Sequence, residues 1–198
     1  MRAATAGRTT PSRKEVTHER IVTAAGRATR RSGYDGTGVA DIMKEVGLTH
    51  GGFYAHFASR EAMLAEAADH AGAESVATLT RVAEAVPAKD ALRSMIRAYL
   101  SKEHVDGIET GCPVAALGSE MPRQAPKVRR AATRHIKEMI DVVALHSPDQ
   151  EGRGGYEQAL VTVATIVGAL VLARAVDDPK LSEALRKASV KHFDSTVT

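Results

Sequence analysis

The sequence predicts an all-α protein, and three observations support this fold class. Apolar residues recur at the helical spacing i, i+3, i+4, i+7 through most of the chain, and the strict alternation of a half-buried β-strand does not occur. No unit of 20–50 residues repeats, which argues against a solenoid. Short clusters rich in Gly, Pro, Ser and Asp interrupt the apolar segments and separate about nine helices.

Length and composition favour a soluble globular protein. The chain has 198 residues, 43% of them hydrophobic and 26% charged, which is enough to bury the core of one or two domains. Cys112 is the single cysteine, so no internal disulfide can form, and a reducing, cytoplasmic location is expected. The N-terminus lacks the apolar segment of a signal peptide. The most apolar run, 159–173, is shorter than the ~20 residues of a membrane span, so we expect a buried helix and no membrane association.

Positive charge is concentrated at the N-terminal end. Residues 1–60 contain 10 Lys and Arg against 5 Asp and Glu, whereas residues 61–198 contain 17 against 19. The segment 1–13 is small, polar and basic, and we expect a flexible arm that can follow DNA phosphates, with a simple solvated tail as the alternative. This asymmetry predicts a polyanionic partner for the N-terminal end alone.

The first long helix is bounded by clear signals. Ser12 and Glu15 fit a capping box at its start, and Gly33 is expected to close it after Arg31. Another helix is expected after Ser59, which can cap it.

Between these helices, the stretch 37–57 (TGVADIMKEVGLTHGGFYAHF) predicts a helix-turn-helix. Its first helix, 39–46, has apolar residues on one face, and Gly47 supplies the positive-φ residue that commonly ends a helix. Thr49 can cap the second helix, 49–56. In such a motif the second helix lies in the DNA major groove.

Particular residues of this motif are candidates for DNA contact. Thr49, His50 and Gly51 begin the second helix and are placed to reach base edges, while Lys44 lies on the exposed side of the first helix and can meet the backbone. The pair Gly51-Gly52 costs about 1 kcal/mol per glycine relative to alanine in a helix. Close packing or close approach to DNA would explain that cost.

The segment 14–65 resembles the DNA-binding domain of the TetR family of repressors. The matching residues are the helix 19–31, Gly33-Tyr34, Thr37, Ile42, Gly47-Leu48-Thr49, Gly52-Phe53-Tyr54, His56-Phe57 and Ser59-Arg60-Glu61-Ala62-Met63-Leu64. The resemblance implies phosphate contacts by Thr37, Tyr54, His56 and Arg60. Met43 departs from the family pattern, where alanine is common. The resemblance further implies that residues 66–198 form a ligand-binding and dimerisation domain.

The C-terminal part shows helical periodicity without a sharp motif. We expect helices over 88–105, from Pro113, over 127–146, over 156–175 and over 180–193. Since a single helix-turn-helix domain makes few DNA contacts, we expect a homodimer that reads a palindromic operator in double-stranded DNA. By resemblance, the last two helices form the interface between subunits.

A small-molecule effector is expected to enter the core of the C-terminal domain. The candidate pocket walls are Met95, Tyr99, Leu117, Met121, Met139 and Val143, each of which could instead simply fill the core. Cys112 precedes Pro113 at a helix start, where a thiolate is favoured; the alternative is a buried structural cysteine.

No constellation for catalysis is recognisable. His104 lies eight residues from Cys112, but no third orienting group and no metal-ligand spacing accompany them. We therefore expect no enzyme, no metal and no cofactor. The sequence predicts a ligand-responsive transcriptional regulator, a repressor released from its operator by a small molecule. The alternative on the same scaffold is a redox or electrophile sensor acting through Cys112. An architectural DNA binder would not need the large helical body.

Overall fold

The computed structural model describes residues 11–147 and 153–196, and these residues contain nine α-helices, two short 3₁₀-helices and no strand. This confirms the all-α prediction. In chain order the helices are α1 (Arg13–Ser32), α2 (Val39–Glu45), η1 (His50–Ala55), α3 (Arg60–Glu84), α4 (Ala88–Tyr99), α5 (Lys102–Asp106), α6 (Pro113–Leu117), η2 (Met121–Arg123), α7 (Pro126–Leu145), α8 (Arg153–Ala175) and α9 (Pro179–Thr196).

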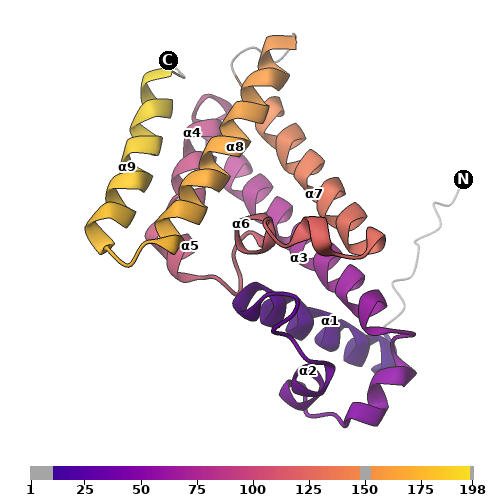
Figure 1. Ribbon diagram of the computed structural model, residues 1–198. Coiled ribbons are helices and arrows are strands. Elements are labelled where there is room, and N and C mark those ends of the chain that lie inside the picture. Colours follow the sequence, from indigo (N-terminus) through magenta and orange to yellow (C-terminus); the bar gives the residue numbers. More distant parts are fainter. Residues whose placement is uncertain (1–10, 148–152, 197–198) are drawn as a thin grey trace, which may run out of the picture.

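Two parts of the molecule are joined by the long helix α3. The head, made of α1, α2, η1 and the first turns of α3, lies at one end, and the remaining helices form the body (Figure 1). The most extensive packing in the chain joins α3 to α7, and α3 also packs on α1 and α4. Because α3 continues through the predicted boundary at residue 65, the division of the chain into 14–65 and 66–198 remains a prediction.

Each part has its own hydrophobic core. The head buries Ile21, Ile42, Met43, Phe53 and Phe57, with Leu117 and Val128 contributed by the body. The body core collects side chains from α3, α4, α7, α8 and α9. The core of the head is therefore completed by side chains from α6 and α7 of the body.

The signals at the ends of the head helices are confirmed. The Ser12 hydroxyl accepts a hydrogen bond from the Glu15 amide, and the Glu15 carboxylate accepts one from the Ser12 amide at 2.6 Å. Gly33 and Gly47, which end the first two helices, have φ values of 75° and 74°. The Ser59 hydroxyl accepts from the Ala62 amide and begins α3.

Two helices differ from the sequence prediction. The expected helix 88–105 is interrupted: α4 ends at Tyr99, and the Ser101 hydroxyl caps α5 by accepting from the His104 amide. The second helix of the motif is a 3₁₀-helix rather than an α-helix, and the Thr49 side chain makes no capping hydrogen bond. The segment has only six residues and contains two glycines, so it is a weak α-helix former, and 3₁₀ geometry is common in such short pieces.

Helix α8 is apolar on most of its surface but is only partly covered. Among the described residues it is the one helix long and apolar enough to cross a membrane by length and composition, with a mean hydropathy of 1.8 over Gly154–Ala175. It packs against α6, α7 and α9. Its other side leaves Leu160, Val161 and Leu172 exposed, so the expected burial on more than one side is incomplete within one chain.

Candidate DNA-binding surface and effector cavity

The predicted base-contacting residues lie on the surface of the head. Thr49, His50 and Gly51 are exposed at the start of η1, and Lys44 is exposed on α2. Tyr54, one turn further, is 70% exposed, and its ring lies 6.4 Å from that of His50 between centroids. This places the two rings and the glycine backbone on one short exposed helix, where polar and aromatic groups are free for a partner.

Neither glycine of η1 is required by the fold. A Cβ added at Gly51 would meet nothing within 4 Å, and one at Gly52 would lie 3.7 Å from the Met43 Cε, an ordinary van der Waals distance. Both glycines lack a positive φ. Met43, the larger residue at a usual alanine position, is fully buried without displacing Gly52. Packing within the protein therefore does not explain this glycine pair.

Two predicted phosphate contacts have side chains that are occupied inside the head. The Thr37 side chain is buried, and its hydroxyl donates to the Gly33 carbonyl at 2.7 Å. The Arg60 guanidinium donates to the carbonyl oxygens of Tyr34 and Thr37. Both side chains hold the 33–37 loop against the start of α3, and their contact with phosphate remains a prediction.

His56 is half-buried, and burial together with nearby positive groups lowers its pKa. The first cause is desolvation, followed by His18, whose ring centroid lies 5.9 Å away, and Lys14. Its Nδ1 atom is buried without a hydrogen-bond partner.

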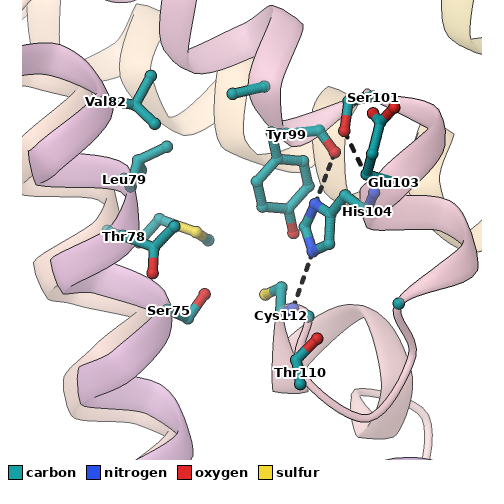
Figure 2. A pocket seen from close by; sticks show the side chains of 14 residues that line it. Ser75, Thr78, Leu79, Val82, Tyr99, Ser101, Glu103, His104, Thr110 and Cys112 are labelled. Carbon is teal, nitrogen blue, oxygen red and sulfur yellow. Dashed lines mark hydrogen bonds between the residues drawn. The ribbon is translucent and has the colours of Figure 1, made fainter. Parts of the chain in front are cut away.

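The body contains a cavity of about 270 Å³ between α3, the α4–α5 junction, the 107–112 loop and α7. Side chains of α3 form one wall and Tyr99 and His104 form the opposite one (Figure 2). The lining residues are Ser75, Thr78, Leu79, Val82, Ala98, Tyr99, Ser101, Glu103, His104, Gly107, Thr110, Gly111, Cys112 and Met139.

The His104 side chain forms hydrogen bonds with backbone groups of both Tyr99 and Cys112. The two ring nitrogens bond in opposite directions: Nδ1 donates to the Tyr99 carbonyl oxygen at 2.7 Å, and Nε2 accepts from the Cys112 amide at 2.9 Å (Figure 2). This arrangement requires the neutral Nδ1–H tautomer. Burial lowers the His104 pKa, which also favours the neutral ring. Because both nitrogens are used, the His104 ring is not a base for the Cys112 thiol.

The Tyr99 hydroxyl is a buried polar group without a hydrogen-bond partner in the described structure. The side chain is 5% exposed, and its ring packs edge-on against His104 at 4.7 Å between centroids. Burial, followed by the neighbouring Cys112 thiol, raises the Tyr99 pKa well above its ordinary value. The hydroxyl is thus protonated, and Cys112, itself 2% exposed, lies beside it on the cavity wall.

The predicted pocket residues are distributed over three places. Tyr99, Cys112 and Met139 line this cavity. Leu117 and Met121 line a second cavity of about 180 Å³ between α1, α3, α6 and α7. Met95 and Val143 are buried in the body core and line neither cavity.

The wall on α3 was missed by the sequence analysis. It consists of Ser75, Thr78, Leu79 and Val82, at the helical spacing i, i+3, i+4, i+7. Two hydroxyl residues within one apolar stripe were the available signal, because a face that packs only against other helices is normally apolar throughout.

The cavity wall is bonded directly to the head. Arg30, buried on α1, donates from Nη1 to the Gly111 carbonyl at 3.1 Å and from Nε to Gly26. The adjacent Arg31 pairs with Glu109 at 3.0 Å. The 107–112 loop therefore contacts both the cavity and the last turn of α1.

Comparisons with known proteins agree with this architecture. The family described as "Bacterial regulatory proteins, tetR family" matches residues 21–67, and the one described as "Transcriptional regulator LmrA/YxaF-like, C-terminal domain" matches residues 88–191. The uncharacterized HTH-type transcriptional regulator YerO of Bacillus subtilis is 30% identical over 95 residues, which are 46% of this chain and 33% of YerO.

Solved structures share the fold over nearly the whole chain. Reduced NemR of E. coli has a TM-score of 0.77 at 20% identity and covers 91% of this chain and 96% of its own. A TetR transcriptional regulator from Chloroflexus aurantiacus has a TM-score of 0.75 at 25% identity, covering 91% and 96%. With a head that matches one family description and a body that matches the other, the chain belongs to the TetR family of transcriptional regulators.

Proposed function

We propose that this protein is a cytoplasmic, homodimeric repressor that binds a palindromic operator and leaves it when a small molecule occupies the 270 Å³ cavity. The observation that carries the proposal is the contact between the cavity wall and the head. The Gly111 carbonyl, which lines the cavity, accepts a hydrogen bond from the buried Arg30 of α1. A ligand that displaces this loop also displaces a helix of the DNA-binding head.

DNA contact is assigned to the exposed end of the head. Thr49, His50 and Gly51 read base edges, and Lys44 and Tyr54 meet the backbone. Thr37 and Arg60, which also hold the 33–37 loop against α3, and His56 contact DNA phosphates, as the family resemblance implies. Gly51 and Gly52 permit a close approach of the backbone, which accounts for glycines that the fold does not need.

The second subunit is assigned to the uncovered side of α8 and α9. Exposed apolar residues gather there, and such patches mark interaction surfaces in soluble proteins. They are Tyr156, Leu160, Val161, Val171, Leu172 and Leu181. If the same side of a second subunit packs against it, the two heads are related by a two-fold axis, as a palindromic operator requires.

The test is selection of binding sites from random DNA with the purified protein. We expect an inverted repeat bound by two subunits, with affinity that falls steeply as salt rises because phosphate contacts release counterions. A single subunit per site, or binding that is insensitive to salt, would overturn the proposal. A panel of small molecules separates a regulator from an architectural DNA binder: a regulator gains thermal stability with some of them, an architectural protein with none.

A second candidate function is an electrophile sensor on the same scaffold, favoured by the position of Cys112. The thiol lines the cavity, so an electrophile that enters it meets sulfur. The NemR structure is described as a reduced form, which concerns that protein and at 20% identity shares only the fold with this chain.

N-ethylmaleimide tests the sensor directly. The Cys112 sulfur would add to one alkene carbon of the maleimide, and the thiol proton would end on the other, giving a thioether. We expect the treated wild-type protein to lose operator binding and the treated Cys112→Ser variant to keep it. Equal responses of the two proteins would refute the sensor and leave the repressor proposal standing.

A further inference from the structure

The Tyr99 hydroxyl is the group in the cavity that most needs a ligand. It is buried on a wall of the cavity beside the Cys112 thiol and makes no hydrogen bond of normal geometry within the described residues (Figure 2). A buried polar group without a partner is costly, and native proteins rarely keep one without a reason. The neighbouring Cys112 thiol is only a weak acceptor.

The phenol ring is held in place, and its hydroxyl can donate a hydrogen bond. His104 fixes the backbone of Tyr99 from one side through its carbonyl, and the ring packs edge-on against the imidazole. Because the hydroxyl stays protonated when buried, it offers an O–H donor at a fixed place in the cavity wall. The complementary group on a ligand is an oxygen that accepts a hydrogen bond.

The rest of the lining restricts size and polarity. Leu79, Val82, Ala98 and Met139 are apolar, and the other α3 residues carry small hydroxyls. The volume of about 270 Å³ lies just below the ~300–1,000 Å³ of pockets that hold drug-sized ligands. A ligand of about one or two rings therefore fits, with most of its surface against apolar side chains.

Charge in the lining disfavours ionised ligands. Within the described part of the chain, Glu103 is the only lining side chain that is charged near neutral pH, and it is exposed at the edge. The nearest arginines turn toward backbone oxygens: Arg30 toward Gly111, and Arg174 toward His104 and Val105. No described lining side chain is cationic, so an anion in the cavity would lose its hydration, and the unpaired Nη1 of the adjacent Arg174 is the group that could offset this loss.

We infer that the cavity takes an uncharged, mostly apolar molecule of about one or two rings, whose carbonyl oxygen accepts a hydrogen bond from the Tyr99 hydroxyl. This rests on the proposed function in taking the cavity as the effector site. The Nη1 atom of Arg174 is buried without a partner, so a competing anionic ligand is the sharpest alternative to test.

Four probes of one shape and nine non-hydrogen atoms separate these chemistries: acetophenone (neutral carbonyl), cumene (apolar), benzoate (anion) and benzamidinium (cation). Their binding to the full-length protein without DNA is measured by ligand-observed NMR. Tyr99→Phe removes only the hydroxyl, and Thr133→Val also removes one hydroxyl, at an exposed residue of α7 that lines neither cavity.

We expect acetophenone to bind tightest, and Tyr99→Phe to weaken it about three- to tenfold, to the level of cumene, while Thr133→Val leaves its binding unchanged. Without ligand, Tyr99→Phe should unfold at the same temperature as wild type or above it, since the lost hydroxyl had no partner. Benzoate or cumene binding as tightly as acetophenone, equal effects of Tyr99→Phe and Thr133→Val on acetophenone binding, or no binding of any probe up to its solubility would each overturn the inference.

Failure of this inference and failure of the proposed function give different results. Binding is measured without DNA, and release is measured separately on the selected operator. If acetophenone binds through Tyr99 and no ligand ever releases the operator, the repressor mechanism fails and the ligand chemistry stands. If other compounds release the operator while acetophenone does not bind, the ligand chemistry alone fails.

Discussion

The head and the body of this protein treat buried polar groups in opposite ways. In the head, the Thr37 hydroxyl and the Arg60 guanidinium both bond to backbone carbonyls and fix one shape. In the body, the Tyr99 hydroxyl and the Arg174 Nη1 are buried without partners beside or near a cavity. A head in which these two side chains are bonded to the backbone is suited to hold one geometry on DNA, whereas a body with unmet hydrogen bonds is suited to respond to a ligand.

The His56 Nδ1 is the exception in the head, since it too is buried without a partner. It lies at the end of η1, the helix assigned to the major groove. The unmet hydrogen bond in the head therefore lies at the end of the helix that we assign to DNA.

The largest expected effect comes from breaking the packed head. Phe53 is 2% exposed and stacks on Phe57 at 5.4 Å between ring centroids. Phe53→Ala should lower the free energy of unfolding by about 3–5 kcal/mol, as for large-to-small changes in other cores, and should abolish operator binding. Denaturant unfolding measures the first effect and a binding assay the second.

The matched control is the adjacent aromatic residue. Tyr54→Ala removes a side chain that is 70% exposed, so stability should change by less than about 0.5 kcal/mol while operator binding weakens. If Phe53→Ala bound the operator like wild type, the head would not be the rigid unit described above.

The same contrast explains how much of the structure could be predicted from the sequence. Helix ends in the head are set by local signals, such as the Ser12–Glu15 capping box and the glycines at 33 and 47, and these were predicted correctly. The break at Tyr99 was missed because Ser101 lies inside an otherwise continuous helical pattern. Its capping role depends on where the chain turns, which periodicity alone does not reveal.

The cavity was harder to predict than the head for a physical reason. Met95 and Met139 look alike in sequence, yet Met95 fills the core and Met139 lines the cavity. Periodicity shows which side of a helix faces inward, but an inward side chain meets either protein or empty space, depending on packing between distant helices. His104 was considered only as a catalytic base, whereas its role is to bond two backbone segments.

The next largest effect should come from the uncovered apolar side of the body. Val161 is 61% exposed on α8, and Val161→Glu places a charge in the proposed subunit interface. We expect a folded monomer whose affinity for the palindrome falls about a hundredfold or more, because the two heads are no longer linked. Sedimentation velocity and operator titration measure the two effects.

Val16→Glu is the control for that charge. Val16 is 42% exposed on α1 in the head, and α1 packs mainly on α2, α3 and α6, so this variant should remain a dimer. Two variants of equal oligomeric state would show that the exposed side of α8 is not the subunit interface.

The smallest expected change in stability is also the one that best separates folding from function in the head. Gly51→Ala adds a methyl group that meets nothing within 4 Å, at a residue without a positive φ. Alanine restricts the unfolded chain more than glycine does, so the free energy of unfolding should stay equal or rise by up to about 1 kcal/mol. Operator affinity should nevertheless fall about tenfold, since an overpacked methyl group typically costs about 1–3 kcal/mol. A variant that is both more stable and equally tight on DNA would mean that the operator does not approach this backbone, and that base contacts come from His50 and Tyr54 alone.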